Sequence, residues 1–566
     1  MGKSLVAIDT DHIKQYVFGT DKLREIRGAS SWLDYLNRIV MTGKEKDKSE
    51  PLPYHVIPVC ANGGGGLFVV ESEDANGAEA FGKDIQRQFR EQTGSGASVT
   101  YAVQALPDHI KVTEGGDDED HLVDDPEMEP YLKLLRWKLR ERKLIPPHII
   151  ISPSHPFMRP CDSCGIFYAR PDEPEKVPRD PGERDELYCL SCQKKRWRDR
   201  DVKTFIRRDV PGDDYLWKKV LKRLKELGYD LPNYPKRPED FNVFSTFKGG
   251  KDYLALIYAD ANGMGKAFDK CKGLPEYSDL ATRVDNAIYD AACIAINTHL
   301  QISKHVKDSA TGEERVFPFD ILMMGGDDVL MVTPATAALD VALTLATAFR
   351  DLTGGEYTLS VGVVLAPIKY PFRLLESLAR TTLKFAKDEG NGESRINFVT
   401  VAGSAGETFT KVFDMLHTPS TKQGRPVDKQ FFATLRPYNP ETLALLLKAI
   451  RDGRKKKLGR SKLHQMREAI MKMNLTTSVS ESRAVLMNWK ADQREYVIDY
   501  VHTFSNQHLN GTADSQNPET LRYERPFPWF FSEKKGDRSI YRTPLLDLTE
   551  LYDFVSGEET ADGDTH

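Results

Sequence analysis

The stretch that decides the fold is Phe319-Asp320-Ile321-Leu322-Met323-Met324-Gly325-Gly326-Asp327-Asp328-Val329-Leu330-Met331-Val332. Two short apolar runs flank four turn residues, which is the pattern of a β-hairpin, and glycine permits the positive φ of a tight turn. Asp327 and Asp328 stand side by side at the tip. Two carboxylates that close repel each other unless a cation lies between them. The pattern therefore indicates either a metal-binding hairpin or a solvated surface turn.

The same four letters occur a second time, as Gly115-Gly116-Asp117-Asp118. This copy lies in the segment 114–130, which is rich in acids, contains no Lys or Arg, and has no strand pattern on either side. We interpret the segment as a solvated acidic linker. The motif is therefore informative only where strands flank it.

Another carboxylate lies upstream of the hairpin. Residues 253–259 are typical of a buried strand, which ends at Asp260 before a helical stretch. A carboxylate at the end of a strand can face a neighbouring hairpin tip, so Asp260, Asp327 and Asp328 are a candidate site for two Mg²⁺ or Mn²⁺ ions. Two such ions align and neutralise the groups of a phosphoryl transfer. The constellation predicts two-metal nucleotidyl transfer.

The composition is that of an ordinary soluble protein. A chain of 566 residues is long enough for three or four domains, and a net charge of −5 gives no overall attraction to nucleic acid. No apolar run approaches the ~20 residues of a membrane span, and the N-terminus has no signal-peptide pattern. We therefore expect a cytoplasmic protein without a membrane contact. Seven cysteines, four of them in Cys-x-x-Cys pairs, fit a reducing compartment and a metal site.

Residues 1–113 repeat the order of elements in residues 249–405. We pair Ile8-Asp9 with Ala259-Asp260, and Gly63-Gly64-Gly65-Gly66 with Gly325-Gly326-Asp327-Asp328. Strand, helix, hairpin, helix and strand is the βαββαβ, ferredoxin-like order, so we predict an α+β protein with two such domains. The glycine tip is interpreted as a nucleotide-binding partner without its own metal, because glycine lets the backbone approach a phosphate. A merely flexible hairpin tip is the alternative.

The region between the two copies, residues 131–248, is expected to hold a metal site and a helical connector. Its four cysteines form two Cys-x-x-Cys pairs, Cys161 with Cys164 and Cys189 with Cys192. This spacing predicts a Cys₄ zinc ribbon, with a redox pair as the minor alternative, and four thiolates leave no open coordination position. The zinc role is therefore structural. The basic stretch 194–208 that follows is either a nucleic-acid contact or a solvated helical face.

The last third of the chain is predicted to be helical. A helix over 371–388 places Lys387 near its end, where a lysine either reaches a triphosphate or is a solvated helix terminus. Residues 406–554 are expected to form a helical C-terminal domain, and the basic run 451–462 within it suits a partner subunit or RNA. Residues 555–566 form an acidic tail that we expect to be disordered.

Together these motifs resemble the large, polymerase-like subunit of type III CRISPR effector complexes. The resemblance covers about residues 1–400, with the motifs in the right order. It is carried by Leu23-Arg24-Glu25-Ile26-Arg27-Gly28-Ala29-Ser30 after the first strand, the Cys₄ ribbon, Gly325–Asp328, residues 359–367 and Lys384-Phe385-Ala386-Lys387.

This resemblance implies an enzyme of antiviral defence that converts ATP into cyclic or linear oligoadenylate messengers when target RNA binds. It implies Asp260, Asp327 and Asp328 as metal ligands, with ATP held between the two palm domains. The residues expected at the nucleotide are Gly63, Gly64, Gly65, Gly66, Gly325, Gly326, Asn262 and Lys387. The implied partners are crRNA, target RNA, and the small, backbone and crRNA 5′-end-binding subunits of the complex.

The chain departs from the family pattern in two ways. Many members begin with an HD nuclease domain, but here the first palm starts near residue 4 and no His is followed by Asp, so we expect no DNase activity. Asn262 stands where many members have another acid, so the metal site is expected to depend more on the hairpin aspartates. A stand-alone GGDEF-like cyclic-nucleotide synthase and a non-catalytic RNA-binding scaffold are the alternative functions.

Overall fold

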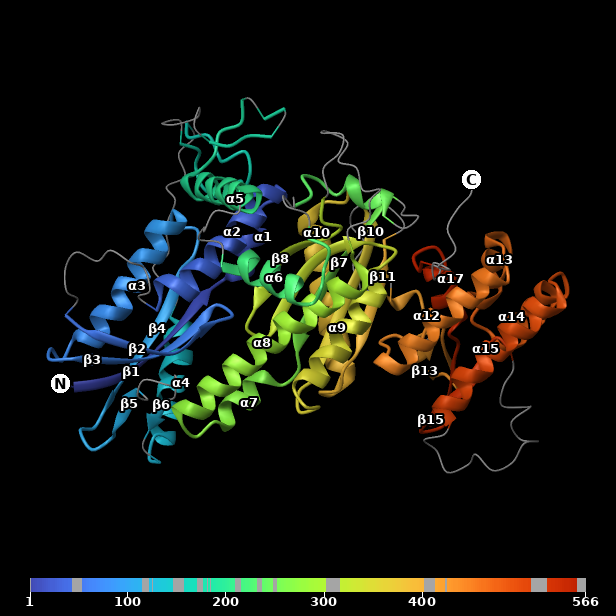
Figure 1. The fold of residues 1–566 in the computed structure, drawn as a ribbon. Helices are drawn as coiled ribbons and strands as arrows, with labels where there is room; N and C mark the ends of the chain where they lie inside the picture. The colour runs from blue at the N-terminus through green and yellow to red at the C-terminus, as the bar shows by residue number, and fades with distance from the viewer. Residues whose placement is uncertain are drawn as a thin grey trace.

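The protein is arranged as three regions in a row (Figure 1), here described from a computed structural model. A first sheet region (blue) lies at one end, a second (green to yellow) in the middle, and a mainly helical region (orange to red) at the other. The structure describes residues 2–42, 53–114, 122–124, 126–145, 157–170, 177–180, 182–183, 185–208, 215–231, 237–247, 252–301, 316–401, 413–422, 425–509 and 527–556.

The first sheet has the strand order β2-β3-β1-β4, with antiparallel neighbours throughout. Alternate residues of β1 face opposite sides, as the two-residue period of a strand requires. Val6 and Ile8 pack beneath α2 and α3, whereas Leu5 and Ala7 pack beneath α4. The elements are β1 (Gly2–Asp11), α1 (Ile13–Phe18), α2 (Leu23–Tyr35), the π-helix η1 (Leu36–Val40), β2 (His55–Asn62), β3 (Gly65–Ser72), α3 (Gly77–Thr93), β4 (Ser98–Leu106) and α4 (Glu129–Leu144).

The second sheet repeats this plan, in the order β11-β10-β7-β9-β8. Helices α8 and α9 cover one face, and α10 covers the other. The additional strand β11 pairs with β10 in parallel. The elements are β7 (Tyr253–Ala261), α7 (Met264–Lys270), α8 (Leu274–His299), β8 (Asp320–Gly325), β9 (Asp328–Pro334), α9 (Ala338–Leu352), β10 (Leu359–Pro367), α10 (Phe372–Gly390) and β11 (Ile396–Thr400).

The strand register corrects the alignment of the two copies by one residue. Asp9 pairs with Gly65 in the first sheet, and Asp260 pairs with Asp328 in the second. The residue equivalent to Asp328 is therefore Gly65, and not Gly66 as the sequence comparison had it. We call Asn62–Gly65 the first turn and Gly325–Asp328 the second turn.

The segment before α4 also differs from expectation. The strands β5 (Val112–Glu114) and β6 (Leu122–Asp124) pair antiparallel, so strands do flank the acidic stretch that we interpreted as a linker without them. Gly115–Asp118 itself lies outside the described residues. The helix α4, which the sequence boundary at 131 assigned to the connector, packs against β4 and β1 of the first sheet.

The basic stretch after the cysteines forms a buried interface, and neither of the two predicted roles is right for its central residues. It lies in α5 (Leu190–Arg208), which crosses α2 so closely that a Cβ on Gly28 would come within 1.7 Å of the Lys195 carbonyl oxygen. Arg196 is fully buried and forms an ion pair with Glu25 over 2.6 Å. Lys195 donates to the carbonyl of Tyr16 over 2.6 Å. The connector continues as α6 (Tyr215–Glu226) and the 3₁₀-helix η2 (Asn242–Thr246).

The C-terminal region contains a sheet as well as helices, which corrects the prediction of a purely helical domain. Strands β14, β16 and β15 form this sheet in that order, with β14 and β16 parallel. The elements are β12 (Thr421–Lys422), β13 (Arg425–Pro426), β14 (Lys429–Phe432), α12 (Pro440–Lys455), α13 (Arg460–Ile470), α14 (Leu475–Met487), α15 (Ala491–Leu509), β15 (Phe530–Lys535), β16 (Arg538–Arg542) and α17 (Leu545–Leu551).

Several members of the basic run 451–462 make contacts inside the protein. Arg451 forms an ion pair with Asp340 of α9 over 2.5 Å, and Arg460 pairs with Asp553 over 2.8 Å. Arg451 thus attaches the C-terminal region to the second sheet's helix α9, and Arg460 forms its ion pair within the C-terminal region. The expected acidic tail lies outside the described residues from 557 onward. Within the described chain no helix is both long and apolar enough to cross a membrane.

Candidate active site

The second turn is a two-residue hairpin loop between β8 and β9. Gly325 pairs with Asp328 across the hairpin, so Gly326 and Asp327 occupy the tip. Gly326 has φ +65°, whereas Asp327 has a negative φ, which are the signs of a type II′ turn. Glycine is favoured at the first tip position of such a turn, and an ordinary residue is allowed at the second. The backbone therefore presents an aspartate at the tip without strain.

The three predicted aspartates come together at this turn. Asp260 lies directly opposite Asp328 in the strand register, and the amide of Ala261 donates to the carbonyl of Asp327 over 2.9 Å. Both turn aspartates are half-buried. Burial and the charge of Asp260 raise the pKa of Asp327 to about 6, and burial with the charges of Asp327 and Asp260 raises the pKa of Asp328 to about 7. The site thus holds more negative charge than its surroundings stabilise.

Two lysines partly offset that charge. Lys387 of α10 forms an ion pair with Asp260 and donates to the carbonyl of Ala261 over 3.0 Å. Lys14 lies above the ring of Tyr258, 4.8 Å from its centroid, and lowers the pKa of both turn aspartates. The hydroxyl of Tyr258 lies 3.4 Å from the carboxylate of Asp328. The cluster therefore combines the three aspartates with two lysines that approach them from helices α1 and α10.

The chemistry of the donors fits divalent cations that prefer oxygen ligands. Half-buried carboxylates with raised pKa values are stabilised by an added positive charge. The three carboxylates do not converge on one point here, because Asp260 is turned toward Lys387. Across the described part of the chain, the four cysteines are the one group of three or more His, Cys, Asp or Glu residues whose ligand atoms lie close enough together to hold an ion.

The side chain of Asn262, which we predicted to lie at the nucleotide, forms hydrogen bonds with residues of the neighbouring strand and loops. Its side-chain amide donates to Thr358 Oγ1 over 2.9 Å and to the carbonyl of Glu393 over 3.1 Å. Ser360 Oγ lies 3.0 Å from Asn262 Oδ1. In the first copy Asp11 occupies the equivalent position, and it accepts hydrogen bonds from Ser98 and Thr100. This position ties the end of one strand to the strand beside it in both copies.

The first turn touches the second turn directly. A Cβ on Gly63 would lie 3.0 Å from the Gly326 Cα, and a Cβ on Gly326 would lie 2.7 Å from the Gly63 Cα. Neither glycine has room for a side chain. Gly63 and Gly64 have φ values of +58° and +89°, which are the signs of a type I′ turn. The two sheets therefore meet through the backbones of their turns.

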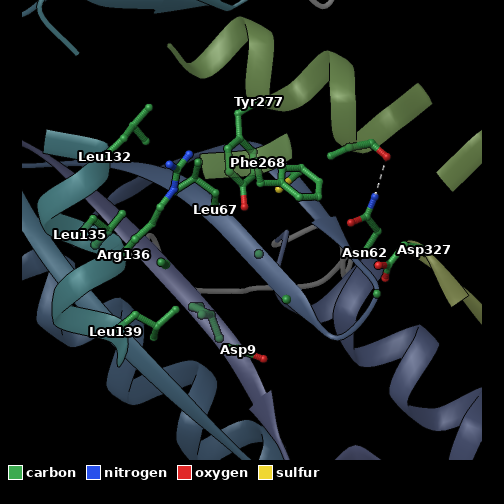
Figure 2. A pocket seen from close by; sticks show the side chains of 18 of the residues that line it. Asp9, Asn62, Leu67, Leu132, Leu135, Arg136, Leu139, Phe268, Tyr277 and Asp327 are labelled. Atoms are coloured by element: carbon green, nitrogen blue, oxygen red, sulfur yellow. Dashed lines mark hydrogen bonds between the residues drawn. The ribbon is translucent and has the colours of Figure 1, made fainter. Parts of the chain in front are cut away.

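A cavity of about 260 Å³ lies beside the first turn and extends to the second (Figure 2). Helix α4 forms one wall through Leu132, Leu135 and Leu139, and Phe268 and Tyr277 face it from the second sheet's helices. Polar side chains also line the cavity, namely Arg136 of α4 and Asn62 and Asp327 at the two turns. Its lining includes Asp9, Asn62, Gly63, Gly65, Gly66, Arg136, Gly326 and Asp327.

The first copy also carries a carboxylate with a lysine partner. Asp9 forms an ion pair with Lys143 of α4, as Asp260 does with Lys387 of α10. Lys143 was missed from the sequence, because β5 and β6 lie between β4 and α4 and have no counterpart in the second copy. Arg136 was also missed, and one of its buried nitrogen atoms has no hydrogen-bond partner beside the cavity.

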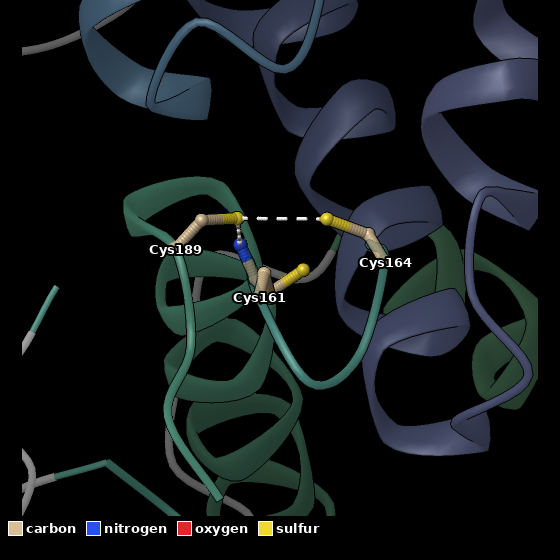
Figure 3. Close-up of side chains that lie close together, drawn as sticks. Cys161, Cys164 and Cys189 are labelled. Carbon is tan, nitrogen blue, oxygen red and sulfur yellow. Dashed lines mark hydrogen bonds between the residues drawn. The ribbon is translucent and has the colours of Figure 1, made fainter. Parts of the chain in front are cut away.

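The four predicted zinc ligands form a compact cluster, of which Figure 3 shows Cys161, Cys164 and Cys189. Their sulfur atoms all lie within 4.8 Å of one another, and Cys164 Sγ is 3.8 Å from Cys189 Sγ. Sulfur atoms ~2.3 Å from a tetrahedral zinc ion lie about 3.8 Å apart, so the cluster fits this metal. The loop that carries Cys161 and Cys164 packs on the first sheet's helices, where Ser163 lies 2.8 Å from the hydroxyl of Thr20.

The region that carries the candidate site is similar to a known protein family. Residues 253–395 match the family model of the Cas10/Cmr2 second palm domain. A segment of 165 residues is 22% identical to the CRISPR system single-strand-specific deoxyribonuclease Cas10/Csm1 (subtype III-A) of Enterococcus italicus, and it covers 29% of this chain and 20% of that protein.

Solved structures of a Csm1–Csm4 cassette are also similar to the chain. The structure in complex with cA4 is 15% identical, and the match covers 71% of this chain and 54% of that chain with a TM-score of 0.40. The structure in complex with AMPPNP is 16% identical over 70% of this chain and 54% of that chain, also with a TM-score of 0.40. The chain thus spans about half the length of these structures and a smaller part of the curated relative.

The resemblance to the large subunit of type III CRISPR effector complexes, which the sequence motifs predicted, is confirmed. The matched residues 253–395 include strands β7 to β10 of the second sheet, and the candidate site lies within them.

Proposed function

We propose that this chain is a target-RNA-activated nucleotidyl cyclase or oligoadenylate synthase, which makes a cyclic or linear adenylate messenger from ATP. The observation that carries the proposal is the pair of half-buried aspartates with raised pKa values at the second turn, inside a second palm domain. Structural side chains rarely hold like charges together in this way, whereas active sites use such arrangements. The proposed role is in antiviral defence, as a subunit of a crRNA-guided complex in the cytoplasm.

Asp260, Asp327 and Asp328 would hold two Mg²⁺ or Mn²⁺ ions, which supply charge neutralisation of the phosphates and activation of the attacking hydroxyl. Lys14 and Lys387 provide fixed positive charge beside the same strand ends. Asp260 becomes available as a ligand when Lys387 turns from it toward a phosphate. A lysine is suited to such an exchange because its flexible stem carries a compact charge.

A second nucleotide fits the cavity beside the first turn. The rings of Phe268 and Tyr277 offer a surface for a base, and Arg136 has a buried nitrogen without a partner. Gly63–Gly65 let a phosphate approach the backbone closely. Because Asp327 also lines the cavity, a nucleotide held there lies next to the proposed metal site. This arrangement gives the first copy a binding role without metal ligands of its own.

The alternatives receive less support. A pure RNA scaffold would bind through basic surfaces, but Arg196, Arg451 and Arg460 form ion pairs within the protein. A stand-alone GGDEF-like synthase would need the same aspartates and differs only in its partners. We propose crRNA, target RNA and the small, backbone and crRNA 5′-end-binding subunits as partners.

A structural zinc ion in the cysteine cluster belongs to the same proposal. The four thiolates would organise a polar loop against the first sheet's helices. Metal analysis of the purified protein should find one zinc ion per chain, and Cys161→Ser should release it. Unchanged zinc content in that variant would disprove this assignment.

The experiment that tests the proposed function replaces both turn aspartates. Asp327→Asn/Asp328→Asn keeps the size of the side chains and the hairpin, so the protein should fold. Synthesis from labelled ATP with Mg²⁺ or Mn²⁺, with guide and target RNA supplied, should fall by at least ~100-fold, as when one strong electrostatic contact to a transition state is removed. The matched control is Asp117→Asn/Asp118→Asn, which changes the same four-letter motif outside the palm.

Equal losses in the two variants, or no loss at positions 327 and 328, would contradict the proposal. The same reactions should include single-stranded DNA. With no His-Asp pair anywhere in the sequence, the protein should leave that DNA intact. Cleavage that survives the double aspartate change would reveal a second active site.

A further inference from the structure

Arg38 comes from the region of the first sheet, here called the first palm side. It contacts helix α8, which is joined to the second turn by a hydrogen bond. Arg38 lies in η1, a π-helical segment that continues α2, and such segments often occur at functional sites. Its two terminal nitrogens donate to Asp285 of α8 over 2.8 and 3.1 Å. Its Nε donates to Asp34, one turn earlier, over 2.8 Å. The guanidinium is therefore held in one orientation between two carboxylates.

Asp285 connects this arginine to the second turn. Asp285 is 4% exposed, and its carboxylate accepts a hydrogen bond from the amide of Gly326 over 2.8 Å. Lys219 of the connector helix α6 also lies within 3.2 Å of the same carboxylate. One buried side chain thus joins the first palm side, the connector and the second turn.

The Gly326 amide is well placed to control the acids, because Asp327 follows it directly and Asp328 is one residue further. A hydrogen bond on this amide fixes the orientation of the peptide at the start of the tip. Arg38 also lies beside the turn itself, since a Cβ on Gly325 would come within 3.1 Å of its terminal nitrogen. The other support at the tip is the backbone contact with Gly63, again from the first palm side.

We propose that Asp285 and Arg38 are positioning residues that hold the second turn in the conformation required for its aspartates to bind metal. The inference rests on the proposed function and adds to it a means of regulation. Any movement of the first palm side relative to the second changes the Arg38–Asp285 contact, and with it the placement of Asp327 and Asp328. The first palm side, whose turn has no aspartate, thereby controls the placement of the two aspartates in the second turn.

The test compares Asp285→Leu with Asp285→Asn and with Asp290→Leu. Asparagine keeps an acceptor for the Gly326 amide but loses the charge. Asp290 lies on the same helix and pairs with Arg223 of the same connector helix over 2.7 Å, and among the described residues no hydrogen bond joins it to the turn. It is therefore a matched control for loss of an α6–α8 ion pair.

The first readout is amide hydrogen exchange of the peptide around residues 320–330, measured without metal or ATP. Exchange there should rise by ~10-fold or more in Asp285→Leu, because an amide whose hydrogen bond is lost opens more readily. It should stay close to wild type in Asp285→Asn and Asp290→Leu. Thermal unfolding of all variants separates this local effect from general destabilisation.

The second readout is synthesis from ATP. In Asp285→Leu, kcat should fall by ~10–100-fold with the KM for ATP within about threefold, as expected when reacting groups are displaced but binding contacts remain. Asp285→Asn should recover most of the loss. If Asp285→Leu does not fold, Arg38→Lys takes its place, because it keeps the charge but loses the two-pronged contact, and kcat should again fall with little change in KM.

Wild-type turn protection or a wild-type rate in Asp285→Leu would overturn the inference, as would an equal loss in Asp290→Leu. The proposed function fails in a different way, namely when the wild-type protein makes no product from ATP with metal and RNA. In that case the inference falls with it, even if the exchange data show that Asp285 holds the turn.

Discussion

The first turn and the second turn share a framework and differ in chemistry. In the first copy the amide of Thr10 donates to the carbonyl of Gly64 over 2.7 Å, and in the second the amide of Ala261 donates to that of Asp327 over 2.9 Å. Both hairpins also have an irregularity in their first strand, opposite the same position of the second. What differs is the backbone at the tip, where Gly64 has φ +89° and Asp327 a negative φ.

This difference explains why the tip of the first turn has a glycine where the second turn has Asp327. An aspartate at the second tip position fits the second turn without strain, whereas in the first turn it would need the left-handed conformation that L-residues avoid. The first turn is therefore suited to backbone contacts, and the second can present side chains. The dihedral angle at this one position thus separates a tip that can carry a side chain from a tip that favours glycine.

The largest difference that we predict between the copies concerns their lysines. Lys387→Met removes the positive charge beside Asp260, and synthesis should fall by ~10–100-fold because fixed charge near the reacting phosphates stabilises the transition state. Lys143→Met removes the equivalent charge beside Asp9, where the turn has no acids, and we expect a loss of only about threefold. Product formation from labelled ATP measures both, and equal losses would show that the first copy takes part in the chemistry.

The second prediction concerns pH and stability without metal. The pKa values of Asp327 and Asp328 are raised from 3.8 to about 6 and about 7, so their charge destabilises the folded protein above pH 7. The penalty is relieved as the pH falls from about 7 toward 4, because the folded state takes up protons first. In metal-free buffer at pH 8, Asp327→Asn/Asp328→Asn should therefore be more stable than wild type by on the order of 2 kcal/mol.

Urea unfolding of the two proteins at pH 8 and pH 5 measures this effect. The gain should shrink at pH 5, and saturating Mg²⁺ at pH 8 should reverse it, because only the wild type gains from the ion. Proton competition should also weaken metal binding below pH 7. A double variant that is less stable than wild type at pH 8 would mean that the aspartates hold the hairpin rather than a cation.

Much of this arrangement could be predicted from apolar patterns. The continuous apolar runs Leu254–Ala259 and Val329–Val332 indicated the central strands, and Asp260 at the end of one strand lies opposite Asp328 of the hairpin in the register. The order of elements was enough to detect the repeat. The one-residue offset was not detectable, because a run of four glycines carries no pattern that fixes a register.

Charge was less informative than apolar pattern. Arg196 and Lys195 look like surface residues in the sequence, but they are buried because Glu25 and the carbonyl of Tyr16 lie opposite them. Such partners are distant in sequence and do not follow a period. Asp285 and Arg38 were missed for the same reason, since a buried ion pair between two domains is visible only once the domains are packed together.

The smallest predicted effect tests the difference in turn type directly. Gly64→Ala places a Cβ on a residue with φ +89° and should destabilise the protein by ~1 kcal/mol. Asp327→Ala changes the equivalent residue, where φ is negative, and should cause no such loss in metal-free buffer. Crowding is a separate cause at Gly64, because its Cβ would come within 2.2 Å of Ile13 Cδ1. The comparison is therefore repeated in an Ile13→Ala background, with stability measured by urea unfolding. If the loss at Gly64 persists there, the backbone dihedral is responsible; if it disappears, crowding explains it and the turn-type argument fails.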